Sequence, residues 1–331
     1  MSLLRTTFRP SVLTARVRQY ATEAAPQKKS SLVPMTLALG GVGGLAYYVY
    51  ASRTGATSTS LPSVLNPEEF ITLPLKKVVP YNHNSSTFIF ELPPKTSSKL
   101  PVASCVVVQA ADPEALKDQK GNPVVRPYTP ISAADNTGEL SFLIKKYETG
   151  VMSKHIHTLK PGDSLKIKGP IHKFPYKENE FDEVALIGGG SGITPLYQVI
   201  SHALSSPSNT TKFKLLFSNV TEEDILMRED IDALAKKHPK TLEVVYLLDK
   251  PKPDWKGPTG FINADVIKKY VAPPTAERTI VMVCANRPTV CPQAPPGQVA
   301  AVAGKKAGMK QGDIGGVLKE LGYTADQVFK F

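Results

Sequence analysis

The sequence lacks the marks of several common protein classes. It has only 3 cysteines among 331 residues, at positions 105, 284 and 291, and this number gives no disulfide framework. It has no recognisable hydrolytic triad, metal-ligand cluster or P-loop. It also has no basic run interleaved with aromatic residues and no nucleic-acid-binding motif, in spite of a net charge of +11. We therefore expect neither a bound metal nor a nucleic-acid partner.

Acidic residues are missing from the start of the chain, where none precedes Glu23. The same stretch holds several serines and threonines and four arginines: Arg5, Arg9, Arg16 and Arg18. This composition is typical of a mitochondrial presequence and fits a secretion signal less well. We predict a presequence over residues 1–29.

Charge of either sign is missing from residues 30–52. A membrane-spanning helix needs about 20 apolar residues, so this segment is just long enough, and tyrosines near its end with cations at both flanks fit interfacial anchoring. We predict a transmembrane segment, either a lasting anchor or a stop-transfer signal that is later cleaved; a helix of a soluble core is the alternative. After a presequence, such a segment predicts import that halts midway. The rest of the chain would then lie on the mitochondrial outer membrane or in the intermembrane space.

The remaining length is enough for two ordinary cores. Residues 53–65 are rich in serine, threonine and glycine and are interpreted as a linker. Residues 30–331 hold 34 basic against 28 acidic side chains. This excess would steer an acidic protein partner, or it consists of ordinary solvated lysines.

Short apolar runs separated by turn residues occupy residues 66–177. They predict strands at residues 86–92, 105–109, 139–145 and 164–168. No long segment with helical periodicity competes with them. We predict an antiparallel β-barrel here, with a sandwich as the alternative.

The segment Arg126–Ser132 reads Arg-Pro-Tyr-Thr-Pro-Ile-Ser and precedes the third of these strands. Pro127 and Pro130 stiffen the backbone, so Tyr128 and Thr129 are presented in an extended geometry. The segment offers a guanidinium to a diphosphate, a phenol ring to a flat heterocycle and a hydroxyl beside it. This chemistry suits a flavin, although Arg-x-Tyr-Thr alone is common by chance.

A second element consists of Gly150, Val151, Met152 and Ser153. A glycine turn followed by a helix start presents backbone N–H groups and a serine hydroxyl to a diphosphate. We expect the helix to continue to Leu159 and to stop at Pro161. His155 and His157 are no metal pair, because a spacing of two places them on different faces of a helix.

From residue 178 to residue 331 apolar strands alternate with helical stretches. The predicted strands are 184–187, 214–217, 242–248 and 279–284, and the predicted helices are 196–204, 224–237 and 263–270. This alternation predicts a parallel sheet with a ligand at the carboxyl ends of its strands.

The first of these strands runs into the loop Gly188–Pro195, which reads Gly-Gly-Gly-Ser-Gly-Ile-Thr-Pro. We expect Thr194 to cap the next helix and Pro195 to be its first residue. Backbone donors and a partial charge of roughly +0.5 would then face a second diphosphate. Asp249 follows the strand 242–248, where it would accept hydrogen bonds from ribose hydroxyls and repel a 2′-phosphate, or simply cap a turn.

With these motifs in this order, residues 65–331 resemble the NADH-cytochrome b5 reductases of the ferredoxin-reductase-like superfamily, and the first fifty residues resemble the fungal mitochondrial form. In that family the matching arginine pairs with the FAD diphosphate, the tyrosine packs on the isoalloxazine, and the threonine lies near flavin N5. The resemblance implies FAD contacts from Arg126, Pro127, Tyr128, Thr129, Lys145, Gly150, Val151, Met152, Ser153 and Thr194. It implies NADH contacts from Gly188, Gly189, Gly190, Gly192, Pro195, Asp249, Cys284 and Pro295.

The resemblance is interrupted after Cys284. The family continues Cys-Gly-Pro-Pro-Gly and sets this cysteine beside the nicotinamide. Here residues 285–294 separate Cys284 from Pro295, and the first glycine is absent. The insertion is either a genuine loop over the nicotinamide pocket, which would impair hydride transfer, or non-coding bases read as protein.

The resemblance implies a monomeric FAD-dependent reductase that takes hydride from NADH and passes single electrons to cytochrome b5 or a similar haem protein. Thr129, Lys145 and Cys284 would lie at the reacting groups. The chain has no haem or iron–sulfur segment of its own, so its electrons must leave to a separate protein. The alternatives are a related flavin reductase with another acceptor such as a quinone, and a non-catalytic membrane-tethered binding protein whose nicotinamide site the insertion blocks.

Overall fold

The structure is a computed structural model that describes residues 61–285, 303 and 311–331. The predicted presequence, the predicted membrane segment, residues 286–294 of the predicted insertion and Pro295 lie outside the described residues. Among the helices that are described, none has the length and apolar character needed to cross a bilayer.

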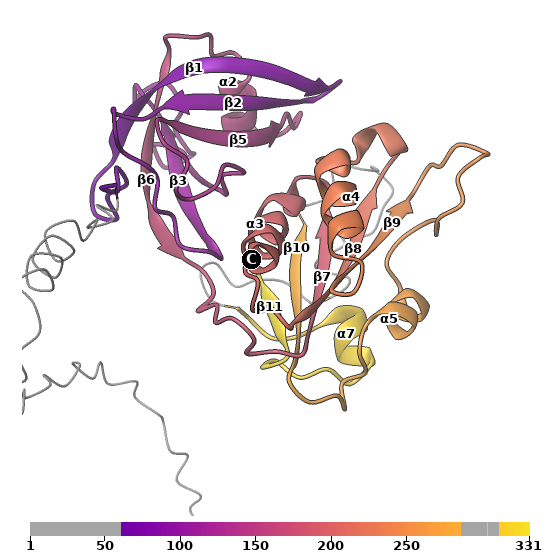
Figure 1. The fold of residues 1–331 in the computed structure, drawn as a ribbon. Coiled ribbons are helices and arrows are strands. Elements are labelled where there is room, and N and C mark those ends of the chain that lie inside the picture. Colours follow the sequence, from indigo (N-terminus) through magenta and orange to yellow (C-terminus); the bar gives the residue numbers. More distant parts are fainter. Residues whose placement is uncertain (1–60, 286–302, 304–310) are drawn as a thin grey trace, which may run out of the picture. The chain divides into compact units, whose positions relative to one another are not determined.

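Residues 71–172 form a six-stranded antiparallel sheet, which confirms the predicted strand arrangement of this region (Figure 1). The strands lie in the order β4 (Val125–Tyr128), β3 (Ser104–Ala110), β6 (Ser164–His172), β1 (Ile71–Asn82), β2 (Ser85–Glu91) and β5 (Glu139–Lys145). One short helix, α2 (Val151–Ile156), connects β5 to β6.

The edge strands β4 and β5 approach each other through the chain that follows β4. The Ile131 N–H donates to the Ser141 carbonyl (2.8 Å), and the Ser141 N–H donates to Ser132 Oγ (3.1 Å). The sheet therefore curls into a partly closed barrel. It encloses a core that includes Phe88, Phe90, Leu140, Phe142, Leu165 and Ile167.

Three elements of this region differ from the sequence-based expectation. Strand β4 was expected only as extended backbone and was not predicted as a strand. The 12-residue strand β1 was not predicted, because only Leu73 and Leu75 of it are fully buried and its sequence contains two prolines and two lysines. Helix α2 ends at Ile156 rather than Leu159, because the N–H groups of Thr158 and Leu159 bond three residues back in a tighter turn.

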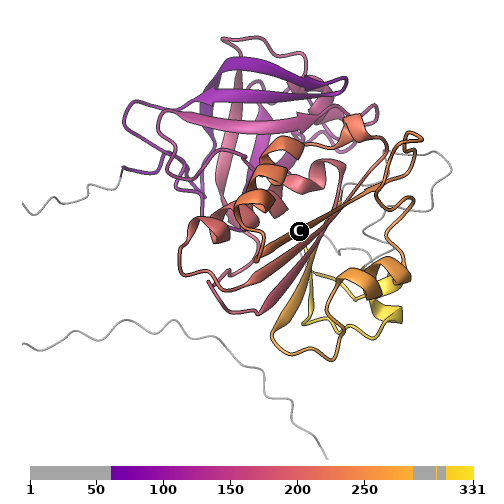
Figure 2. The same ribbon diagram turned by 45° about the vertical axis from the view of Figure 1, so that its right-hand side comes forward.

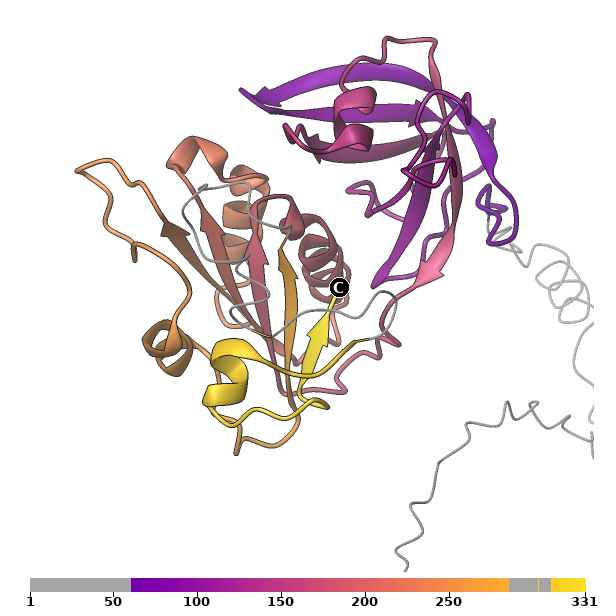
Figure 3. The same ribbon diagram turned by 180° about the vertical axis from the view of Figure 1, so that it is seen from behind.

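The second sheet has five strands, all parallel, as predicted. Figure 2 shows them side by side, in the order β11 (Val328–Lys330), β10 (Thr279–Ala285), β7 (Glu183–Gly189), β8 (Lys212–Asn219) and β9 (Leu242–Leu248). Helices α3 (Ile193–Ser205) and α4 (Arg228–Lys237) cover one face, and α5 (Ala264–Tyr270) and α7 (Gly316–Glu320) cover the other (Figure 3).

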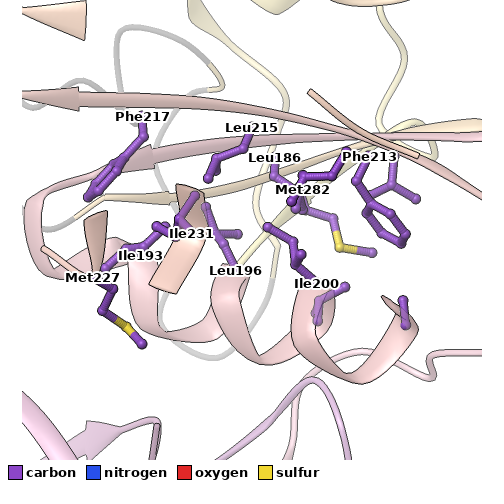
Figure 4. Close-up of a cluster of buried hydrophobic side chains, with 14 of the residues drawn as sticks. Leu186, Ile193, Leu196, Ile200, Phe213, Leu215, Phe217, Met227, Ile231 and Met282 are labelled. Atoms are coloured by element: carbon purple, nitrogen blue, oxygen red, sulfur yellow. The ribbon is translucent and has the colours of Figure 1, made fainter. Parts of the chain in front are cut away.

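Strand residues of this sheet alternate between the two cores. Leu186, Leu215 and Met282 pack against α3, as Figure 4 shows, whereas Ile187 and Leu216 belong to the core under α5 and α7. Both faces are therefore apolar, which explains the nearly continuous hydrophobic runs of these strands.

Two predicted helix starts are wrong. Helix α3 begins at Ile193, so Thr194 is no N-cap and Pro195 is the third residue rather than the first. The reason is a 3₁₀ turn, η1 (Gly190–Gly192), which brings the chain into helical geometry early. Helix α4 begins at Arg228 rather than Asp224, because Met227 adopts a left-handed φ of 57° that interrupts the helix.

Candidate functional site

The glycine loop between β7 and α3 combines a close approach with an unusual backbone angle. A Cβ on Gly188 would lie 2.9 Å from Cδ1 of the buried Leu196, so glycine lets the strand pack against α3. Gly190 has a φ of +52° and meets open space, and it turns the chain into η1. The loop leads through η1 into the 13-residue helix α3. The Ile193 N–H already donates to carbonyls of η1, so the N–H groups at the start of η1 are the ones left for an anion.

Four predicted or newly found positions lie at the same edge of the parallel sheet, where its strands end. Gly189 ends β7, Asn219 ends β8 and Asp249 follows β9. Cys284, near the end of β10, is in register with Gly188. The fold therefore brings together the glycine loop, Cys284 and Asp249, which the sequence predicted to share one ligand.

Asp249 carries an incompletely paired carboxylate. Its N–H donates to the Asn219 carbonyl (3.0 Å), but its buried Oδ1 has no hydrogen-bond partner in the described part of the chain. Burial raises the pKa of Asp249 to about 6, although nearby Lys250 acts in the opposite direction. No hydrogen bond in these residues supports a turn-capping role, so the carboxylate is left for a ligand hydroxyl.

Phe261 is an aromatic side chain that sequence reasoning missed. Thr259 forms a β-bridge with Leu248, and the Gly260 N–H donates to the Leu248 carbonyl (2.9 Å). Phe261, which is 43% exposed, therefore follows a segment that is paired with the end of β9, the strand that Asp249 follows. An exposed ring at this place suits stacking with a flat heterocycle.

The Arg-Pro-Tyr-Thr motif lies on β4 and just beyond it, in the extended backbone that its prolines predict. Arg126 is exposed, and its Nη1 donates to the neighbouring Val125 carbonyl (2.9 Å). The Tyr128 ring packs edge-on against Phe142 (6.4 Å between centroids), and burial raises the pKa of Tyr128. The motif thus presents a charged group and a half-buried ring, which fits a flavin nucleotide.

The Gly150–Ser153 turn is more tightly built than expected. A Cβ on Gly150 would lie 2.5 Å from Ser153 Oγ, so only glycine fits. Ser153 Oγ donates to the Gly150 carbonyl (3.0 Å) and accepts from the Tyr147 N–H (3.1 Å). The hydroxyl that was expected at the diphosphate therefore holds the turn. The N–H groups of Val151, Met152 and Ser153, in the first turn of α2, stay available to an anion.

Lys145 forms a buried ion pair that the sequence did not predict. Its Nζ lies 2.9 Å from Oδ1 of Asp224, at the end of the 3₁₀ turn η2 (Glu222–Asp224), and both side chains are less than 10% exposed. Burial raises the pKa of Asp224, but the hydrogen bond and charge of Lys145, together with Thr221, outweigh it and leave that pKa below its usual value. Thr221 and Asp224 form a capping box, so the spacing Thr-x-x-Asp could have predicted this turn from the sequence.

A second contact joins the antiparallel sheet region to the glycine loop. The hydroxyl of Tyr147, which follows β5, hydrogen-bonds the hydroxyl of Ser191 in η1. Lys145 and Tyr147 thus both bind residues at the carboxyl edge of the parallel sheet. The positions predicted to surround FAD and those predicted to surround NADH are therefore adjacent.

Comparisons with known proteins agree with this arrangement. Residues 72–176 match the oxidoreductase FAD-binding domain family, and residues 186–290 match the oxidoreductase NAD-binding domain family. The cytochrome b5 reductase domain of Ulva prolifera nitrate reductase superposes with a TM-score of 0.66 at 27% identity, covering 82% of this chain and 100% of that domain.

Two curated relatives cover almost the whole chain, and both carry the name NADH-cytochrome b5 reductase 2. The protein of Mycosarcoma maydis is 44% identical over 336 residues, covering 95% of this chain and 93% of the relative. The protein of Debaryomyces hansenii is 41% identical over 306 residues, covering 91% and 95%. On this similarity, carried by both nucleotide-binding domains, the chain belongs to the NADH-cytochrome b5 reductase family.

Proposed function

We propose that this chain oxidises NADH through bound FAD and delivers the electrons singly to cytochrome b5 or a similar haem protein. FAD, when bound, supplies the conversion of a two-electron hydride donor into a one-electron donor. The observation that carries the proposal is the shared sheet edge, where the glycine loop, Cys284 and the unpaired Asp249 carboxylate meet. The family relationship supports the same reaction.

The parallel-sheet domain binds and orients NADH. Backbone N–H groups of the glycine loop and of η1, which follows it, bind the diphosphate. The Asp249 carboxylate accepts hydrogen bonds from the ribose hydroxyls and disfavours a 2′-phosphate by charge repulsion. Cys284, in register with Gly188, lies beside the nicotinamide.

The antiparallel-sheet domain binds FAD. The exposed Arg126 guanidinium pairs with the FAD diphosphate together with the N–H groups of the α2 turn, which Gly150 keeps in place. The half-buried Tyr128 ring packs against the isoalloxazine, and the Thr129 hydroxyl donates to the flavin. Met152 is buried beneath this turn and supports it.

Lys145 contributes a fixed positive charge near the flavin. The Asp224 carboxylate holds its ammonium at 2.9 Å, so the charge keeps one position instead of moving with a flexible side chain. A cation at that position stabilises negative charge that develops on the reduced ring.

The cellular setting of the proposed reaction rests on composition alone, whereas the choice of cytochrome b5 as acceptor also follows the relatives' names. An acidic cytochrome b5 would be steered by the excess of lysine and arginine in residues 30–331. The presequence and the uncharged segment 30–52 support attachment to the mitochondrial outer membrane or release into the intermembrane space. We further propose that the chain acts as a monomer.

An anaerobic NADH titration of the purified, FAD-loaded full-length chain tests the proposal. Stoichiometric bleaching of the flavin absorbance, followed by its return when oxidised cytochrome b5 is added, is the expected result. Flavin that stays oxidised would contradict it and favour a non-catalytic binding protein, with the insertion 285–294 blocking the nicotinamide. Bleaching with transfer to a quinone but not to cytochrome b5 would favour another acceptor.

A further inference from the structure

Asn219, the last residue of β8, has a buried amide without a partner. The residue is only 4% exposed, and neither Oδ1 nor Nδ2 meets a hydrogen-bond partner within the residues that the structure describes. An asparagine amide offers two donors and one acceptor. Leaving such buried groups unpaired is costly, so folded proteins keep few of them. Packing among the described residues therefore gives no structural reason for an amide at this position.

The backbone of Asn219 is firmly held, unlike its side chain. In the β8–β9 register Asn219 lies opposite Leu248, and its carbonyl accepts the Asp249 N–H (3.0 Å). The strand end is thus fixed at the carboxyl edge of the sheet, where open parallel sheets bind ligands. Three neighbouring strands, β7, β8 and β9, end here in a glycine loop, in the Asn219 amide and in Asp249. Neither the amide nor Oδ1 of Asp249 has a partner in the described part of the chain.

We propose that Asn219 is a nucleotide-binding residue. Together with Asp249, it binds the adenosine ribose of NADH and the phosphate next to that ribose. A ribose hydroxyl both donates and accepts hydrogen bonds, whereas an ionised carboxylate only accepts. The amide supplies the missing donors to the ribose or phosphate oxygens, and the Asp249 carboxylate accepts hydrogen bonds from the ribose hydroxyls. This inference rests on the proposed NADH site. It goes beyond that site by giving a ligand-binding role to Asn219, at the end of β8.

Asn209 provides a matched comparison at the opposite end of β8. It precedes that strand, at the amino edge of the sheet, and its Nδ2 donates to the Thr211 carbonyl (3.0 Å), although its Oδ1 is unpaired within the described residues. The Asn209 amide nitrogen therefore has a local structural partner, whereas that of Asn219 has none among the residues described. Ligand binding at the carboxyl edge should depend on Asn219 and be indifferent to Asn209.

Titration of ADP-ribose into the oxidised, FAD-loaded full-length chain by isothermal calorimetry tests the assignment. Asn219→Leu replaces the amide with a bulkier apolar side chain that has the same branching and number of heavy atoms, and we expect about threefold to tenfold weaker binding from the lost hydrogen bond. Its thermal midpoint should equal or exceed that of the wild type, because a buried unpaired amide is removed. Asn219→Ser, which keeps one hydroxyl, should give an intermediate affinity, and Asn209→Ala should bind as the wild type does.

Two results would overturn the assignment. If Asn219→Leu and Asn219→Ser bind ADP-ribose as tightly as the wild type, the amide does not contact the nucleotide, whatever their stability. If the wild-type chain, although loaded with FAD, binds no ADP-ribose, the proposed NADH site itself fails and the assignment fails with it. Weaker binding by both variants at an unchanged or higher midpoint supports it.

Discussion

The two sheet regions differ in whether their polar functional groups have hydrogen-bond partners within the described chain. In the antiparallel region, Ser153 is bonded on both sides and Lys145 is paired with Asp224. At the carboxyl edge of the parallel sheet, Asn219 and the Oδ1 of Asp249 lack partners among the described residues. The flavin region therefore completes most of its hydrogen bonds with its own chain. The nucleotide region retains a desolvation cost that a bound dinucleotide would relieve.

The largest expected effect comes from breaking the pair that joins the two regions. Asp224→Ala leaves the Lys145 ammonium buried without a counter-charge, which should lower the free energy of unfolding by about 3–5 kcal/mol. The denaturant midpoint of the full-length chain measures this. Adding Lys145→Met to Asp224→Ala should restore most of the loss.

The exposed pair of Lys76 and Glu139 is the matched control for that prediction. Lys76→Met should leave the denaturant midpoint nearly unchanged, because solvent screens this pair. Equal changes in the denaturant midpoint for Asp224→Ala and Lys76→Met would show that the buried pair stabilises the chain no more than an exposed pair does.

Gly150→Ala should have the next largest effect, confined to the flavin region. The new Cβ would lie 2.5 Å from Ser153 Oγ and 3.0 Å from Tyr147 Cβ, so the turn must shift at a cost of about 1–3 kcal/mol. We expect purified protein with a lower ratio of flavin to protein absorbance, while ADP-ribose affinity stays at the wild-type value. A full flavin complement would show that the turn does not hold FAD.

Asp249 should make NADH binding depend on pH in the mildly acid range. Its pKa in the unliganded protein is raised to about 6, and the ionised form is the one that accepts both ribose hydroxyls. The affinity for NADH should therefore rise as the pH increases through 6 and level off above it. Asp249→Asn should bind about tenfold more weakly and remove this dependence. A retained pH profile in that variant would assign the titration to another group.

Ser153→Ala should have the smallest effect. It leaves the Tyr147 N–H without its acceptor and removes the bond to the Gly150 carbonyl, which we expect to cost about 1 kcal/mol of unfolding free energy. Because the hydroxyl holds the turn, FAD affinity should fall less than about threefold, a change below 1 kcal/mol. A much larger fall in FAD affinity, measured by flavin fluorescence, would mean that the hydroxyl turns to the diphosphate.

Short apolar runs in the sequence predicted the strands that pack most of their large side chains into a core. Strands 139–145 and 242–248 were predicted with their observed limits, because most of their side chains are large and apolar or β-branched and turn residues flank them. Strand β1 escaped prediction, since its exposed face carries lysines and most of its length is solvated. The order of the two nucleotide-binding motifs along the chain could likewise be predicted, because glycine loops and Arg-Pro-Tyr-Thr are local patterns.

Contacts between residues that are distant in the sequence could not be predicted from the sequence. Lys145 and Asp224 are 79 positions apart, and Asn219 and Asp249 become neighbours only when β8 and β9 align in parallel. The sequence by itself determined two sheets of different type, the glycine loop and the acidic end of β9, because each depends on short-range patterns of polarity and turn residues. The tertiary structure alone decided which charges neutralise each other and which buried polar groups stay unpaired, because burial and pairing depend on residues that the chain brings together only after folding.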